Sequence, residues 1–274
     1  MSAEASHPAD VWASGAAYEP YVGRWSRLVA REVLAWLAVP PGSRWLDVGC
    51  GTGALSQTIL ALGSPSRVKG IDASAGYVAF ARGQVRDERL QFEVGDAQAL
   101  PAETASYDVA VAGLVLNFVP QPARMVAELA RAVRPGGLVA VYVWDYAGQM
   151  QLMRNFWDAA VALDPAAQDL DEGRRFPVCQ PDRLTDLFRQ AGLGTVQARA
   201  IDVPTRFRDF DDYWSPFLGG QGPAPSYAMS LNEERRAVLR ARIRVGLPVA
   251  ADGSIELIAR AWAVRGVREA RGRR

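Results

Sequence analysis

Residues 45–53 constrain the fold of this chain more than any other stretch, because they join an apolar segment to closely spaced glycines. Residues 44–48 are expected to form a buried strand and residues 54–62 a helix. Between them, three glycines occupy alternate positions, where glycine permits a sharp turn and the close approach of a ligand to the main chain. This pattern predicts a site of the kind that holds a nucleotide-like cofactor.

The overall composition excludes some classes of partner. The chain has 274 residues, of which 49% are hydrophobic and 22% charged, as is usual for a soluble globular protein. A net charge of +1 gives no general field that would attract nucleic acid, so a nucleic-acid partner is not expected. Five arginines fall within the last ten residues, but no aromatic side chains lie among them, so we expect a solvated end and not an RNA-binding arm.

The two cysteines, Cys50 and Cys179, are too few for a disulfide framework or a cysteine-rich metal site, so no metal is expected. Such sparing use of cysteine is typical of a cytoplasmic protein. The first ten residues contain no apolar core of signal-peptide length, and no stretch approaches about 18 consecutive apolar residues. Neither secretion nor a membrane span is therefore expected.

Five apolar segments alternate with helix-like segments, an order that favours a parallel sheet covered by helices on both faces. The five segments are 44–48, 67–71, 90–94, 107–116 and 138–144. Two further segments with alternating apolar residues, 196–203 and 255–264, are expected to complete the sheet. The predicted fold class is therefore α/β, with a doubly wound, mostly parallel sheet of seven strands.

Polar residues and glycine follow the first five strands at matching positions. In a doubly wound sheet, ligands bind beyond the carboxyl ends of the strands. The residues at these ends are Asp47, Gly49, Asp72, Asp96, Asn117 and Asp145. A single acidic residue at a strand end is common in turns, but the whole series predicts that these residues surround one ligand.

Two less regular segments, 147–180 and 204–254, are expected to form a cap on a single domain whose cofactor-binding core is residues 18–146. The second segment carries five aromatic residues, which would either line a ligand pocket or form the core of the cap. They are Phe207, Phe210, Tyr213, Trp214 and Phe217.

Ahead of the first strand, Tyr18, Tyr21 and Trp25 precede an amphipathic helix. These aromatic residues either fix the helix to the sheet or belong to a lid that folds over the glycine loop. In the second case, Arg24 or Arg27 would bind a ligand carboxylate through two hydrogen bonds.

The glycine pattern by itself fits two kinds of cofactor. Residues 49–54 match the dinucleotide fingerprint, and Asp72 lies near the distance expected for a carboxylate that binds ribose. Asp47 argues against a dinucleotide, because a carboxylate just before the first glycine would repel a pyrophosphate. The same carboxylate suits a ligand that bears an ammonium group and a sulfonium, and S-adenosyl-L-methionine has both and no phosphate.

Four motifs resemble those of the class I S-adenosylmethionine-dependent methyltransferases. They are Leu46-Asp47-Val48-Gly49-Cys50-Gly51-Thr52-Gly53, Gly70-Ile71-Asp72-Ala73-Ser74, Gly95-Asp96-Ala97 and Arg134-Pro135-Gly136-Gly137. Within that superfamily the chain most resembles the small-molecule branch that includes the ubiquinone- and menaquinone-type methyltransferases. The resemblance implies a Rossmann-like fold, S-adenosyl-L-methionine as cofactor and a methyl-transfer reaction.

The resemblance also implies roles for individual residues. Asp47 and the backbone of the glycine loop would hold the methionine end of the cofactor. Asp72 would accept hydrogen bonds from both ribose hydroxyls, and Asp96 with the Ala97 backbone would bind the adenine edge. The other expected cofactor-binding positions are Tyr21, Arg24, Gly49, Cys50, Gly51, Gly53, Ala73 and Asn117.

For three positions of the loop we can state what the side chain, or its absence, is expected to do. A Cβ atom at Gly51 or Gly53 would fill space that the cofactor occupies. Cys50 is expected to pack beneath the loop and to have no redox or nucleophilic role.

Methyl transfer depends largely on aligning the acceptor with the methyl group in a dry pocket, so a general base is not always required. The only histidine, His7, lies in the irregular N-terminal stretch. The candidate catalytic residues are Asn117, Asp145, Tyr146, Tyr18 and Tyr21. Asn117 is the preferred one, where it would either orient the acceptor or serve as a turn residue at the strand end.

Motifs that the sequence lacks exclude some classes of methyl acceptor. After the fourth strand the chain reads Asn117-Phe118-Val119-Pro120, which departs from the Asn/Asp-Pro-Pro-aromatic motif of adenine methyltransferases. Cytosine-5 chemistry needs a cysteine nucleophile, and neither cysteine has a matching context. We therefore expect a small, largely apolar acceptor that is methylated at O, C or N. The alternatives are RNA or protein methylation, and a non-catalytic protein that binds the cofactor; the oligomeric state stays open.

Overall fold

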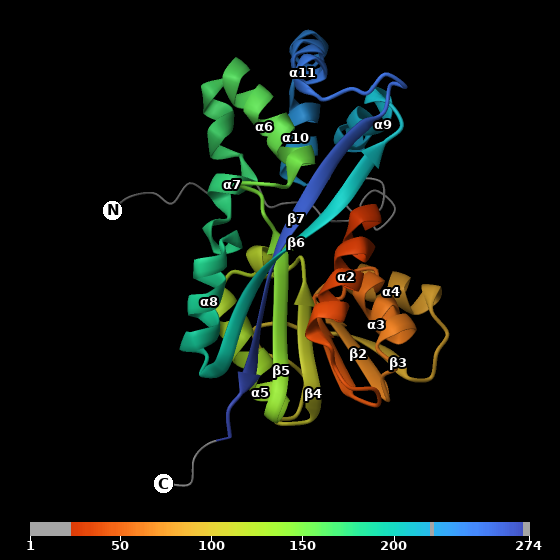
Figure 1. Ribbon diagram of the computed structural model, residues 1–274, viewed down its shortest axis with the longest axis vertical. Coiled ribbons are helices and arrows are strands. Elements are labelled where there is room, and N and C mark those ends of the chain that lie inside the picture. Colours follow the sequence, from red (N-terminus) through yellow and green to blue (C-terminus); the bar gives the residue numbers. More distant parts are fainter. Residues whose placement is uncertain (1–22, 220–221, 271–274) are drawn as a thin grey trace.

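The computed structural model describes residues 23–219 and 222–270, which contain one seven-stranded sheet with helices on both faces (Figure 1). The strands follow the order β3-β2-β1-β4-β5-β7-β6. They are β1 (Arg44–Val48), β2 (Arg67–Asp72), β3 (Leu90–Val94), β4 (Tyr107–Gly113), β5 (Val133–Trp144), β6 (Leu193–Phe207) and β7 (Ile255–Arg268). The first five run parallel, and β7 is antiparallel to both neighbours. The predicted fold class is confirmed.

Five helices flank the sheet as the alternating sequence pattern predicts (Figure 1). One face is covered by α2 (Arg24–Leu37), α3 (Ala54–Leu62) and α4 (Ala75–Gln84), and the other by α5 (Pro122–Ala132) and α8 (Pro181–Gln190). In α5, Pro122 occupies the first turn, where the backbone needs no N–H donor. Met125 and Leu129, one helical turn apart, are fully buried against the sheet.

The fourth strand ends earlier than predicted. Leu114 has a φ of 60°, a left-handed conformation that a β-strand cannot continue through. A short 3₁₀ helix, η2 (Leu116–Phe118), follows this turn. The turn brings Val115 and Phe118 to the carboxyl edge of the sheet, where they line the cavity described below.

The strand expected over 196–203 is longer than predicted, because β6 continues through Pro204 to Phe207. Pro204 lacks an N–H donor, but β6 is the edge strand of the sheet, where one missing donor is tolerated. At the far end of the β6–β7 ladder, Phe207 pairs with Ile255. In Figure 1 the two strands extend together past the parallel strands toward the upper helices.

These upper elements come from two separate stretches of the chain (Figure 1). The first contains α6 (Gln151–Leu163), η3 (Pro165–Asp169), α7 (Glu172–Arg175) and η4 (Pro177–Cys179), so the segment 147–180, expected to be less regular, is largely helical. The second contains α9 (Phe210–Trp214), η5 (Ser215–Gly219), α10 (Pro223–Ser230) and α11 (Glu233–Gly246). Phe156 and Phe217 join the two stretches by stacking with their ring centroids 4.6 Å apart.

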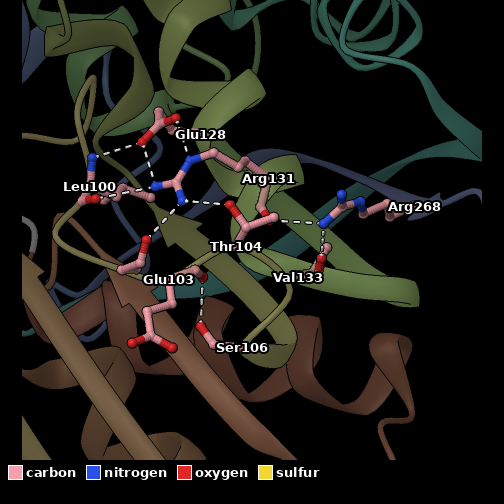
Figure 2. Close-up of polar contacts among 9 residues, drawn as sticks. Leu100, Glu103, Thr104, Ser106, Glu128, Arg131, Val133 and Arg268 are labelled. Carbon is pink, nitrogen blue, oxygen red and sulfur yellow. Dashed lines mark hydrogen bonds and ion pairs between the residues drawn. The ribbon is translucent and has the colours of Figure 1, made fainter.

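Two of the five C-terminal arginines hold the fold together and are not solvated. Arg268 donates from Nη1 to the main-chain oxygens of Arg131 and Val133 (Figure 2). The Arg131 guanidinium in turn binds Glu128 with two hydrogen bonds of 2.7 and 2.8 Å. Arg265 donates 2.8 Å to the main-chain oxygen of Trp36 in α2. The expectation of a solvated end is therefore wrong for both, and the other three arginines lie outside the described residues.

Candidate functional site

A cavity of about 300 Å³ lies at the carboxyl edge of the sheet and reaches from the glycine loop to the upper helices. The loop after β1, the end of β2, and the segments that follow β4 and β5 form its lower walls. Met153 of α6, Glu172 of α7 and Pro223 of α10 contribute from above. The cavity thus joins the predicted cofactor site to the predicted cap, as expected for a site that holds two molecules.

The three loop glycines all have positive φ angles, but they leave space for different groups. A Cβ on Gly51, where φ is 52°, would meet no atom within 4 Å, so its open side faces free space in the cavity. A Cβ on Gly49 would lie 2.5 Å from the Val115 side chain, and one on Gly53 would lie 3.0 Å from Phe92. The expectation for Gly53 is therefore corrected: its missing side chain makes room for an aromatic ring of the protein and not for a ligand.

Asp72 links the end of β2 to the glycine loop. Its Oδ2 accepts a 2.9 Å hydrogen bond from the N–H of Gly51, and its Oδ1 accepts a 2.8 Å bond from the N–H of Ser74. Asp72 and Ala73 both line the cavity, as predicted for residues that contact a cofactor. Each carboxylate oxygen has further lone pairs, so Asp72 can also accept hydrogen bonds from a ligand.

Asp47 lies beneath the loop and does not line the cavity. It is fully buried, and its Oδ2 accepts a 2.6 Å hydrogen bond from the Ser56 hydroxyl. Among the described residues, its Oδ1 has no hydrogen-bond partner. Burial raises the pKa of Asp47 to about 7, and the nearby charge of Asp72 acts in the same direction. A cation in the cavity would favour the ionised form of Asp47.

Asp96 and Ala97 also lie outside the cavity lining. Asp96 is exposed, and its Oδ1 accepts hydrogen bonds from the Gln98 backbone at 2.8 Å and from the Gln98 side chain at 3.3 Å. These hydrogen bonds lower the pKa of Asp96. The adenine contact expected here stays a prediction, because the structure shows only that Asp96 is exposed and outside the cavity lining.

Of the five candidate catalytic residues, three lie in the described part of the chain, and the structure separates them. Only Tyr146 lines the cavity. Asn117 is buried, and within the described chain neither of its amide atoms has a hydrogen-bond partner, while the next residue, Phe118, lines the cavity in its place. The Oδ2 of Asp145 accepts a 2.9 Å bond from the N–H of Gln149, so this carboxylate fixes a turn.

Arg24 is directed toward the cap and not toward the cavity. Its guanidinium lies 4.4 Å from the ring centroid of Trp25 and 4.7 Å from that of Phe207, and it pairs with Asp212 of α9 at 3.2 Å. It is not among the described residues that line the cavity, so its expected role as a carboxylate clamp is not supported. Tyr18 and Tyr21 lie outside the described residues.

Known proteins resemble this chain in sequence and in fold. A family model described as "Methyltransferase domain" matches residues 46–141. A ubiquinone biosynthesis O-methyltransferase of Burkholderia pseudomallei is 34% identical over 179 residues, which cover 61% of this chain and 73% of that protein. This chain belongs to the class I S-adenosylmethionine-dependent methyltransferases.

Two further comparisons agree with this assignment. A 2-methyl-6-phytyl-1,4-hydroquinone methyltransferase of Synechocystis is 32% identical over 187 residues, which cover 67% of this chain and 57% of that protein. The structure of phosphoethanolamine N-methyltransferase 2 of Haemonchus contortus, in complex with S-adenosyl-L-methionine, superposes with a TM-score of 0.58 at 15% identity and covers 93% of this chain and 56% of that one. At so low an identity the second likeness shows the fold alone.

The cavity of this methyltransferase fits S-adenosyl-L-methionine. The described residues that line it include the carboxyl groups of Asp72 and Glu172 and no basic side chain, and Asp47 adds a third carboxyl group beneath the loop. This arrangement favours a cationic cofactor over one that carries phosphate groups. The open side of Gly51 leaves the main chain accessible, and Asp72 is available to the ribose hydroxyls.

Cys50 lines the cavity, as predicted for a residue of the cofactor site, and Cys179 does not, but neither cysteine of the methyltransferase is in a state to act as a nucleophile. Cys50 packs its side chain against Val78, Ala81 and Phe92, beneath the loop as expected. Cys179 is buried in the main core. Burial raises the pKa of both thiols, so both stay protonated and unreactive near neutral pH.

The acceptor end of the cavity has a different wall from the one that the sequence indicates. None of the five aromatic residues between Phe207 and Phe217 lines it. They pack against one another and against α6, where the Tyr213 hydroxyl donates 2.8 Å to the main-chain oxygen of Leu152. These residues form the cap core, which was one of the two expectations. The apolar wall is built instead from Phe118, Tyr142, Trp144, Tyr146, Met153 and Pro223.

Sequence reasoning missed Glu172, which lines the acceptor end of the cavity. It is only 1% exposed, and burial raises its pKa to about 8. Its Oε2 accepts a hydrogen bond from the indole N–H of Trp157 in α6. A glutamate in a polar stretch carries no periodic signal, so only the three-dimensional path of the chain reveals its position.

Proposed function

We propose that this enzyme transfers a methyl group from S-adenosyl-L-methionine to an oxygen, carbon or nitrogen atom of a small, largely apolar organic molecule. The observation that carries the proposal is the wall of aromatic and apolar side chains that continues directly from the glycine loop. Such a wall excludes water and favours an apolar acceptor over a polymer segment. The printed names of two relatives point to the same class, since both act in the chemistry of quinones or hydroquinones.

We assign the site residues as follows. Asp72 would bind the ribose, and the backbone of Gly49 and Gly51 would hold the methionine end, with Asp47 supporting the positive charge from beneath. Asp96 would bind adenine. When bound, the cofactor supplies an electrophilic methyl group on a positively charged sulfur. The chain itself orients the acceptor against this group and keeps water out.

We also propose that the whole chain is one methyltransferase domain, with residues 147–180 and 208–254 forming the cap that selects the acceptor. The second range starts after Phe207, where β6 ends. A cytoplasmic location is part of the proposal, because both buried cysteines are free thiols. Among the described residues, no helix is long and apolar enough to cross a membrane.

Calorimetry with S-adenosyl-L-methionine and with NADH tests the cofactor assignment. We expect binding of S-adenosyl-L-methionine and none of NADH; the opposite result would contradict the proposal. Methyl-labelled cofactor is then incubated with the enzyme and separate fractions of small molecules, RNA and protein. Label is expected in the small-molecule fraction.

Two outcomes would favour the alternatives. Label in RNA or protein would indicate a macromolecular acceptor, although Arg265 and Arg268, which suggested it, are engaged within the fold. Truncation after residue 270 removes the other three arginines and should leave activity unchanged if the acceptor is small. Tight cofactor binding without any transfer would indicate a non-catalytic protein.

A further inference from the structure

Hydrogen bonds of its neighbours fix the main chain around Glu172 at the acceptor end of the cavity. The preceding residue, Asp171, accepts a 2.8 Å hydrogen bond from the N–H of Gly173 and so begins α7. Arg154 of α6 binds both oxygens of Asp171, at 3.0 and 2.7 Å. The same guanidinium donates 3.1 Å to the main-chain oxygen of Tyr146, another residue of the cavity wall. The position of Glu172 is therefore fixed relative to that wall.

The two carboxyl oxygens of Glu172 have different surroundings. Oε2 accepts the hydrogen bond from Trp157, whose ring packs against Tyr227 of α10. Oε1 is buried and has no hydrogen-bond partner among the described residues. A buried oxygen without a partner is uncommon in proteins, and at a ligand cavity it indicates a group that a ligand satisfies. One oxygen thus orients the carboxyl group, and the other keeps its hydrogen-bonding capacity on a residue of the cavity wall.

The charges around Glu172 suit reversible proton transfer. Burial is the main cause of its raised pKa, and the charge of Asp171 adds to it, while Arg175 lowers it. The negative charge of Asp171 is itself mostly offset by its ion pair with Arg154. From the other elements, Tyr146 belongs to the same cavity wall and Tyr227 packs against Trp157, and neither carries a charge near neutral pH. A carboxyl group with a pKa near neutrality is well matched to act as a base.

We infer that Glu172 accepts the proton of a hydroxyl group on the acceptor, and therefore that this enzyme methylates oxygen. The inference rests on the proposed function. The O–H bond breaks, its proton binds to Oε1, and its electron pair stays on the acceptor oxygen, which becomes the nucleophile. One negative charge moves from the carboxylate to that oxygen, so the net charge of the pair is unchanged. The neutral carboxyl group returns its proton to solvent after the product leaves.

The surroundings favour a hydroxyl over an amine. An aliphatic amine is a cation near neutral pH, and moving it into a cavity walled by aromatic and apolar groups costs more desolvation energy than moving a neutral hydroxyl. An ammonium group would also pair with the carboxylate as an ion, and its lone pair would remain bound to the proton. A hydroxyl group needs only one proton acceptor, and the cavity provides one at Oε1.

The test uses 4-nitrophenol as a probe on the full chain saturated with S-adenosylhomocysteine. Above pH 8 both the free probe and Glu172 of the free enzyme are ionised. Two anions would repel each other in the cavity, so the complex forms only when it takes up one proton from solvent. The affinity of wild type for the probe is therefore expected to fall about tenfold per pH unit between about pH 8 and 9.5. The variant Glu172→Gln should show no such dependence, because it has no second negative charge. The control Glu234→Gln makes the same change at an exposed position of α11 and should behave like wild type.

A second measurement needs no variant. The infrared band of a neutral carboxyl group should appear in wild type at pH 9 when 4-nitrophenol binds, as Glu172 takes up the proton. A wild type that does not bind the probe, a pH dependence retained in Glu172→Gln, or no carboxyl band would each overturn the inference.

Activity gives the third readout and separates this inference from the proposed function. Glu172→Gln should bind S-adenosylhomocysteine as wild type does, yet lose about 100-fold or more in kcat/KM with hydroxyl acceptors. Methylation of amines or carbon acceptors by wild type, with hydroxyl compounds left unmodified, would overturn the role of Glu172 and leave the proposed function intact. Failure of wild type to bind the cofactor would overturn the proposed function itself.

Discussion

The carboxylate of Asp72 binds the N–H of Gly51 at 2.9 Å and so joins the end of β2 to the glycine loop after β1. Its other oxygen binds the N–H of Ser74, at the start of α4, at 2.8 Å. One side chain therefore fixes two segments that both line the cavity. This preorganisation lowers the entropic cost of binding a cofactor, since the loop does not have to become ordered when the ligand arrives.

Replacement of Asp72 by alanine should weaken the binding of S-adenosyl-L-methionine by about 10- to 100-fold, the range expected when a charged hydrogen-bond acceptor is lost. Asp72→Asn keeps one acceptor oxygen and should lose less. Asp96→Ala, at an exposed position bonded to Gln98, should have the smallest effect of the three. Calorimetry measures the affinities, and equal values for Asp72→Ala and wild type would refute the ribose assignment.

Gly51→Ala separates backbone strain from ligand space. An added Cβ meets no atom within 4 Å at either Gly51, with a φ of 52°, or Gly42, with a φ of 80°. Both alanine variants should therefore lose about 1–2 kcal/mol of stability from the left-handed conformation. Only Gly51→Ala places a methyl group in the cavity, and it should lose a further 1–3 kcal/mol or so of cofactor affinity. Equal affinities of the two variants would show that the cofactor does not approach Gly51.

Glu172 should make the stability of the protein fall as the pH rises. Its pKa is about 8 in the folded state against 4.5 for an ordinary glutamate, so between these limits the folded state holds a proton that the unfolded chain releases. The stabilisation is complete below about pH 4.5 and is lost by about pH 8, at up to about 1.4 kcal/mol per pH unit. The pKa of Asp47, which burial raises to about 7, contributes to the pH dependence in the same direction.

Urea denaturation at a series of pH values measures this effect. The slope of stability against pH should be smaller in Glu172→Gln than in wild type, and Glu234→Gln should keep the wild-type slope. Identical slopes in wild type and Glu172→Gln would mean that Glu172 titrates near its ordinary pKa.

Arg268→Ala should lower the free energy of unfolding by about 1–3 kcal/mol, because the Arg268 guanidinium donates to two main-chain oxygens at the end of α5 and the start of β5 (Figure 2). Arg199→Ala, at an exposed position of the neighbouring strand β6, is the matched control and should change stability by less than about 0.5 kcal/mol. Equal losses in urea denaturation would indicate that Arg268 does not anchor the C-terminal strand.

The cofactor end of the site was predictable because its signals are local. The strand, the glycines and the following helix are adjacent in sequence, and the parallel order of strands places Asp72 beside the loop at Gly51. Hydrophobic periodicity likewise indicated most of the strands and helices, since it reports which face of an element is buried. The strand predicted over 196–203 was too short because Pro204 resembles a strand end, although an edge strand tolerates it.

The acceptor end was not predictable, because periodicity does not say against which partner a face is buried. The aromatic residues from Phe207 to Phe217 could line a pocket or fill the cap, and packing against Phe156 decides for the cap. In the sequence, Arg268 resembles part of a charged tail. It lies 137 positions from Arg131 along the chain, and only the folded sheet brings the two within hydrogen-bond distance.

The sequence by itself therefore determined the sheet, the glycine loop and the cationic cofactor, all of which depend on neighbours along one chain segment or on a regular strand order. Tertiary structure alone decided that Tyr146 and Glu172, and not Asn117 or Asp145, line the cavity. The physical reason is that α6 and α7 fold back over the carboxyl edge of the sheet, and the resulting burial gives Glu172 its raised pKa.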